Sequence, residues 1–107
     1  MEDNKRLLSM LGIAKKSGRI IIGAPMIIEH IQKKKIISPD EFLVLEASDT
    51  SDNTHKKLSD KCTYYNIRHV RINATCCELG ASLGKGAIAA VAILGADMCR
   101  GVEAKIN

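Results

Sequence analysis

Cysteine and histidine are the residues of this sequence that could bind a metal or act as nucleophiles, and neither is arranged for such a role. The four cysteines lack the C-x₂-C spacing that places two thiolates on one zinc ion: they are Cys62, the adjacent Cys76 and Cys77, and Cys99. The three histidines are far apart, and none lies in a motif with a nucleophile or a second ligand: they are His30, His55 and His69. We therefore expect no catalytic residue, metal, cofactor or enzymatic activity. We expect Cys62 and Cys99 to be core residues.

A glycine-rich segment from Gly80 to Gly86 surrounds Lys85, as phosphate-binding loops surround their lysine. The segment is one residue short of that motif and has no Ser or Thr after the lysine. It also lies between an expected helix and a strand, whereas a phosphate-binding loop follows a strand and opens a helix. Nucleotide hydrolysis is therefore not expected, and the glycines indicate a flexible loop.

The formal net charge of +4 is unevenly distributed along the chain. Between residues 5 and 35, eight basic residues accompany Glu29 alone: Lys5, Arg6, Lys15, Lys16, Arg19, Lys33, Lys34 and Lys35. Between residues 39 and 60, six acidic residues outnumber two lysines: Asp40, Glu41, Glu46, Asp49, Asp52 and Asp60. We expect a bipolar surface whose basic end suits a polyanion such as nucleic acid. An ordinary solvated surface accounts for the same composition equally well.

The length and composition indicate one globular domain. The chain has 107 residues, of which 46% are hydrophobic and 26% charged. No apolar run approaches the roughly 20 residues that cross a bilayer, and the N-terminus does not resemble a signal peptide. We expect a cytoplasmic protein without a membrane partner.

Helical spacing of apolar residues alternates with short apolar runs along the chain. Helices are expected at residues 4–16, from Gly23 to Lys35, from Asp52 or Asn53 to about Tyr65, behind a capping box at 75–78, and after an Asp97 cap. Strands are expected at 19–22, 42–45, 69–72 and 88–94, the last being central. This alternation predicts a single α/β domain over residues 1–107, a three-layer α/β/α sandwich with about four strands.

Three segments carry a specific resemblance: LGIAKKSGRIIIG, FLVLEASDTSDNTHKKLSDKCTYYNI and ELGASLGKGAIAAVAI. Together they resemble the bacterial branch of the ribosomal protein L-seven-Ae and L-thirty-e family, small kink-turn RNA binders of α/β/α fold. The resemblance extends from Leu11 to about Asp97. It implies an RNA-binding, ribosome-associated accessory protein whose partner is structured ribosomal RNA.

The family binds a sharply bent RNA with the N-terminus of its second helix and with the loop before its last strand. Gly23 matches the glycine that lets RNA approach the helix. The family's base-reading Asn-Glu pair, however, falls at Pro25 and Met26, and its following lysine at Glu29. Each base contact is worth roughly 1–3 kcal/mol of discrimination, so these replacements reduce the expected sequence-specific affinity.

The loop before the last strand retains flexible backbone, the Lys85 cation and Ile88, an apolar residue for stacking under an extruded base. Lys15, Lys16 and Arg19 are close in sequence to the second helix and are expected to contact phosphates. The candidate RNA-binding residues are Lys15, Lys16, Arg19, Gly23, Pro25, Met26, Gly84, Lys85, Gly86, Ala87 and Ile88.

A second hypothesis starts from the same replacements. Ile22, Pro25 and Met26 are apolar where the family is polar. An exposed apolar patch marks a protein contact, so the domain would bind a protein partner or form a homodimer. A strand at 20–22 would instead bury some of these side chains, because neighbouring residues point to opposite faces.

Overall fold

A computed structural model describes residues 2–34 and 41–106 of the chain. The helices are α1 (Glu2–Lys16), α2 (Ala24–Lys34), α3 (Asp52–Tyr64), α4 (Cys76–Ser82) and α5 (Ala96–Glu103). The strands are β1 (Ile20–Ile22), β2 (Phe42–Glu46), β3 (Arg68–Arg71) and β4 (Ala90–Leu94). The expected helix end at Lys35 and the acidic Asp40 lie outside the described residues.

The four strands form one mixed sheet in the order β1-β4-β2-β3. β4 pairs antiparallel with both β1 and β2, whereas β2 and β3 are parallel. The expected central position of the last strand is therefore confirmed. The parallel pair ends with Glu46 opposite Arg71, which brings two charged residues together at one edge of the sheet.

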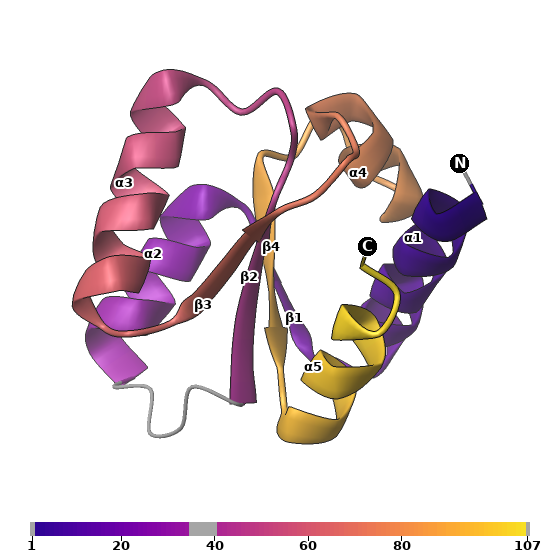
Figure 1. The fold of residues 1–107 in the computed structure, drawn as a ribbon, viewed down its shortest axis with the longest axis horizontal. Coiled ribbons are helices and arrows are strands. Elements are labelled where there is room, and N and C mark those ends of the chain that lie inside the picture. Colours follow the sequence, from indigo (N-terminus) through magenta and orange to yellow (C-terminus); the bar gives the residue numbers. More distant parts are fainter. Residues whose placement is uncertain (1, 35–40, 107) are drawn as a thin grey trace.

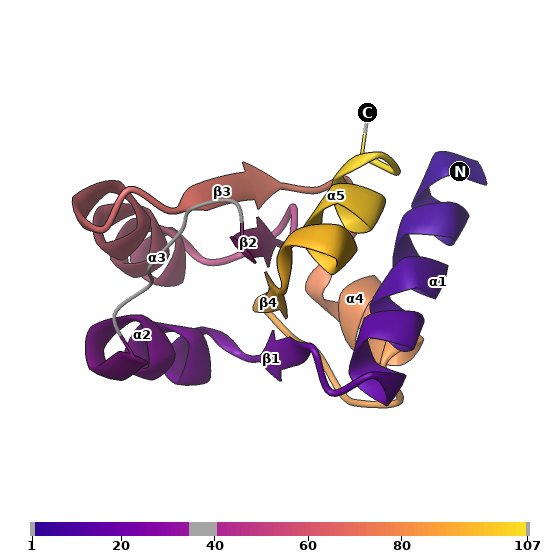
Figure 2. The same ribbon diagram turned by 90° about the horizontal axis from the view of Figure 1, so that it is seen from below.

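Helices cover both faces of this sheet, as the alternation of elements predicted. Figure 1 shows α2 and α3 on one side and α1, α4 and α5 on the other, and Figure 2 shows the strands between these two layers. Phe42 and Val44 of β2 pack in the cluster under α2 and α3, while Leu43 and Leu45 pack under the other layer. Side-chain alternation along one strand thus builds two cores and confirms the α/β/α sandwich.

Two helix starts differ from expectation. Ser51, not Asp52 or Asn53, is the N-cap of α3, and its hydroxyl accepts a hydrogen bond from the Thr54 N–H. At α5 the cap position is Gly95 and no side chain bonds there, because Asp97 lies inside the first turn and pairs with Arg100. The capping box of Thr75 and Glu78 at α4 is confirmed in both of its hydrogen bonds.

The strand bounds shift by one or two residues from those expected. β3 begins at Arg68 and ends before Ile72, and β4 begins at Ala90, so that Ile88 belongs to the preceding loop. Cys62 and Cys99 are buried, as expected. Among the described residues, no helix combines the length and apolar character needed to cross a membrane.

Candidate nucleic-acid interface

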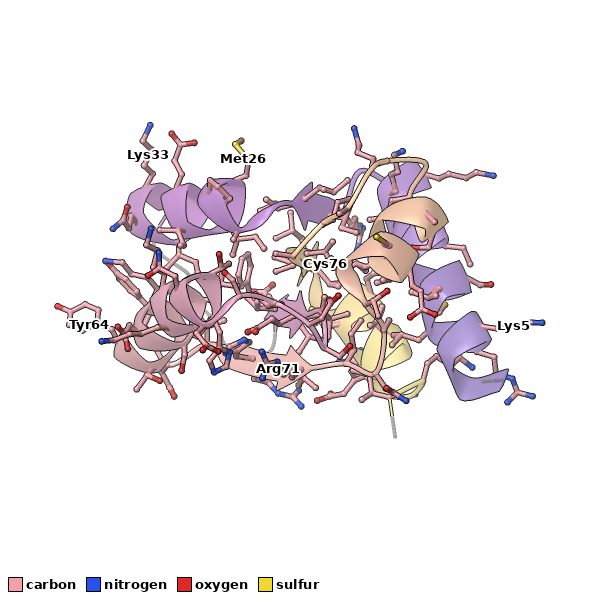
Figure 3. The ribbon with its side chains drawn as sticks, turned by 90° about the horizontal axis from the view of Figure 1, so that it is seen from above. Lys5, Met26, Lys33, Tyr64, Arg71 and Cys76 are labelled. Carbon is pink, nitrogen blue, oxygen red and sulfur yellow. The ribbon has the colours of Figure 1, made fainter. Side chains whose placement is uncertain are left out.

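The start of α2 is held against the start of β4. Gly23 donates its N–H to the carbonyl of Ala90 at 2.9 Å and has φ of 98°, a conformation that favours glycine. The helix begins at the next residue, where the first N–H groups have no partner within the helix. Pro25 and Met26 of this first turn are exposed, and the Met26 side chain projects from the surface (Figure 3). Pro25 has no N–H and the N–H of Ile27 donates to the carbonyl of Gly23, so the backbone donors that an anion could meet at this end are those of Ala24 and Met26.

The loop before β4 leads to Ala90, the partner of Gly23, and is tied to α4. The N–H of Lys85 donates to the carbonyl of Gly80, and the N–H of Ile88 donates to that of Cys76. Residues 84–87 are exposed, whereas Ile88 is only 8% exposed and packs in the core under α1, α4 and α5. This burial does not fit the base-stacking role expected for Ile88, because its side chain fills the core. The exposed part of the loop consists of glycines, Ala87 and the Lys85 cation.

A second cation reaches the same loop from α1. The ammonium of Lys15 donates to the carbonyl of Leu83 at 2.6 Å and so links the last turn of α1 to the residue before the loop. Lys16 follows it and is exposed. Three sequence-predicted groups therefore lie along one side of the molecule: the end of α1, the start of α2 and the loop at 84–87.

Arg19 lies just after α1, where its N–H donates to the carbonyl of Ala14, but the length of β1 separates it from the start of α2. Its guanidinium lies against Gly95, where an added Cβ would come within 2.7 Å of a guanidinium nitrogen. Gly95 follows β4 whereas Ala90 begins it, so Arg19 and Gly23 mark opposite ends of β1. Nearness in sequence did not indicate this, because a strand separates the two residues.

The apolar surface of the alternative hypothesis is smaller than the sequence predicts. Ile22 is half-buried and packs against the core under α1, so it contributes little to an exposed patch. Met26 is 55% exposed and borders a shallow hollow on α2, lined also by Ile21, Glu29, His30 and Lys33. Met26 and Lys33 project from the same side of this helix (Figure 3).

A polar cluster that sequence reasoning missed surrounds Glu46. This carboxylate was expected on the acidic surface but is fully buried. Its oxygens lie 2.8 and 2.9 Å from Nδ1 of His55, and Oε1 lies 2.6 Å from Nε2 of His69. Nε of Arg71 lies 3.3 Å from Oε2. Histidines that are far apart in sequence are thus brought to one carboxylate, the only triad of this kind among the described residues that could hold a metal.

Asp49 and Cys76 form a second polar contact beyond the end of β2. Oδ1 of Asp49 accepts a hydrogen bond from the Cys76 N–H at 2.7 Å, and this bond is the main cause that lowers the pKa of the Asp49 carboxyl. Burial, followed by the hydrogen bond and charge of Asp49, raises the pKa of the Cys76 thiol to about 11. Cys76 therefore remains a thiol at neutral pH and is not an activated nucleophile.

These features define an α/β/α domain that presents a helix N-terminus, a glycine-rich loop and nearby cations on one side. Comparison with known proteins narrows the class. The chain is 33% identical over 84 residues, 78% of either protein, to RNA-binding protein YlxQ of Bacillus subtilis (strain 168). It is 31% identical over 65 residues to RNA-binding protein YlxQ of Enterococcus faecium, and this match covers 61% of this chain and 58% of that relative.

The chain belongs to the YlxQ family, which is of the L-seven-Ae and L-thirty-e type. No family model matches it. A solved structure of a protein with unknown function from Bacillus halodurans C has a TM-score of 0.78 and 28% identity, and covers 94% of this chain and 95% of that one. That similarity agrees with the fold, so the resemblance noted in the sequence is confirmed for family and architecture.

Proposed function

We propose that this protein binds structured RNA through the start of α2 and the loop at 84–87. The hydrogen bond between Gly23 and Ala90 is the main observation behind the proposal, because it joins the start of α2 to the strand that directly follows the loop with Lys85. Backbone donors at the helix start and the cations of Lys15, Lys16 and Lys85 suit phosphate oxygens. The name of the YlxQ relatives as RNA-binding proteins supports the same assignment.

We further propose that the RNA is bent in the manner of a kink-turn and belongs to the ribosome. The family resemblance supports this step, and the glycines at 23, 84 and 86 leave room for a sharply turned backbone to approach. Pro25 and Met26 offer no polar side chain to base edges. Recognition therefore rests on the shape and the phosphate positions of the RNA more than on direct base contacts.

The test is a titration of the purified protein with a kink-turn RNA and with an unbent duplex of equal length over a series of salt concentrations. We expect tighter binding of the bent RNA and an affinity that falls steeply with salt. Equal, salt-sensitive binding of both RNAs would contradict kink-turn recognition and leave RNA binding by a basic surface. No binding at low salt would contradict RNA binding altogether.

Exposed Met26 favours a second candidate function, a protein contact or homodimer on α2. The Met26→Asp variant tests it by sedimentation of the free protein and by RNA titration. Loss of self-association with unchanged RNA affinity would support a protein contact at this patch. A protein that is monomeric with or without the substitution would contradict the homodimer.

A further inference from the structure

Glu46, His55 and His69 come together between β2, β3 and the first turn of α3. Glu46 is the last residue of β2, His69 lies in β3, and His55 lies in the first turns of α3. Their potential ligand atoms, one from each side chain, all lie within 4.8 Å of one another.

Arg71 holds one side of the Glu46 carboxylate. Its Nε lies 3.3 Å from Oε2, and its Nη2 donates to the carbonyl of Thr50 at 3.3 Å. Oε1 lies 2.6 Å from Nε2 of His69, and Nδ1 of His55 lies 2.9 Å from Oε1 and 2.8 Å from Oε2. The arginine therefore orients the carboxylate, as partners of metal ligands commonly do, while an imidazole nitrogen stays within reach of each of its oxygens.

We propose that Glu46, His55 and His69 bind one divalent transition-metal ion, zinc being the best fit to this ligand set. Two imidazoles and one carboxylate are the ligands of a three-residue zinc site with an open fourth position. The Glu46 side chain is fully buried, His69 is 14% exposed and His55 is 40% exposed, so an ion and a water molecule reach the site past His55.

Binding requires a small rearrangement of these side chains. In the hydrogen-bonded form, each nitrogen that faces Glu46 carries a proton, because a carboxylate only accepts. On metal binding each neutral imidazole keeps one proton, on its outer nitrogen, and the facing nitrogen uses its lone pair for the metal. Ligand atoms around zinc, at about 2.0–2.1 Å from the ion, require imidazole movements on the order of 1 Å.

The test measures Co²⁺ and Zn²⁺ binding by the purified full chain carrying Cys77→Ser, which removes the exposed thiol. Co²⁺ reports a tetrahedral site through its visible absorption, and calorimetry measures the Zn²⁺ stoichiometry. We expect one ion per chain. We expect His55→Gln and His69→Gln each to weaken binding by roughly tenfold or more. His30→Gln is the matched control, because that ring stacks on Phe42 outside the triad, and it should bind as the parent does.

Circular dichroism establishes that the compared variants are folded. Absence of a bound ion, or binding that both histidine variants retain, would overturn the proposal. The proposal does not depend on the RNA function, whose titrations use no metal ion.

Discussion

Lys15 and Lys85 bring charge to one loop from two different elements. We expect Lys85→Glu to weaken RNA binding for every RNA sequence. The plot of log affinity against log salt concentration should also become shallower, by an amount that corresponds to the loss of about one phosphate contact or more. Lys5→Glu is a matched control, since Lys5 is exposed on α1 but lies about ten residues, or roughly 15 Å, before Lys15. Fluorescence anisotropy at several salt concentrations measures both. Equal losses in the two variants would mean that total charge, not this loop, determines binding.

The charge of Asp49 makes a pH-dependent contribution to stability. Its hydrogen bond from the Cys76 N–H lowers the folded-state pKa below the ordinary value of 3.8. The stabilisation is therefore complete above the unfolded-state pKa and is lost as the pH falls through the lower folded-state pKa. Asp49→Asn should be less stable than the parent at pH 7, and the difference should shrink below pH 3.8. Urea unfolding over this pH range checks the prediction, and a constant difference would contradict it.

The sequence predicted the residues of the helix start and the loop because glycines and a local resemblance mark them. It did not predict the Glu46 cluster, because only the parallel pairing of β2 and β3 brings His69 near Glu46. One pattern pointed to burial: Glu46 is in phase with Phe42 and Val44, which face the core under α3. Counting Glu46 among surface acids overlooked this periodicity.

At the scale of elements, α4 and the loop at 84–88 are packed so closely that only glycine fits between them. A Cβ on Gly80 would overlap the carbonyl of Gly86 and come within 2.6 Å of its carbon. We expect Gly80→Ala to destabilise the protein by about 1–3 kcal/mol and to weaken RNA binding, because the loop with Lys85 must move. Urea unfolding and RNA titration measure the two effects.

Gly12 provides the control for this substitution. It lies within α1, and a Cβ there meets no heavy atom within 4 Å. Gly12→Ala should therefore stabilise the protein by roughly 0.5–1 kcal/mol and leave RNA affinity unchanged. Gly80→Ala with parental stability and RNA affinity would show that the loop position does not depend on this contact.

Helix and strand positions could be predicted well because each depends on local periodicity, whereas caps and pairing depend on tertiary contacts. Asp97 has a good cap residue type, but the chain enters α5 through Gly95 with φ of 92°. Similarly, Ser51 caps α3 ahead of two residues that are also good caps. Where several suitable N-cap residues lie one or two positions apart, the one that becomes the cap depends on where the segment before the helix ends.

At the scale of the whole molecule, the layers and the central place of the last strand were predictable, and the pairing partners of the strands were not. Alternating helices and strands require a sheet covered on both faces. The order β1-β4-β2-β3 places the last strand in the centre, and the preceding loop therefore meets the start of α2. The proposed RNA surface depends on the pairing of β1 with β4, which brings Gly23 to Ala90 and which no local pattern encodes.

The two cores share the strands between them, which predicts that they unfold together. Leu45 and Val44 are neighbours on β2, yet each packs in a different cluster. We expect Leu45→Ala to cost roughly 2–5 kcal/mol and Val44→Ala about 2 kcal/mol, each with a single unfolding transition. Tyr64 and Tyr65 are in edge-to-face contact at the end of α3, so their near-ultraviolet circular dichroism reports the layer opposite Leu45.

If the loss of packing under α1, α4 and α5 is transmitted through β2 to α3, the unfolding transitions of Leu45→Ala should coincide when followed by far-ultraviolet circular dichroism and by the tyrosine signal. Val44→Ala is the reciprocal variant, because it removes contacts on the tyrosine side directly. A tyrosine transition that keeps its parental midpoint in Leu45→Ala, while the far-ultraviolet signal shifts, would contradict this coupling. The layer of α2 and α3 would then be a separate folding unit, and the position of the α2 start beside Lys85 would depend on docking between two units instead of on one continuous sheet.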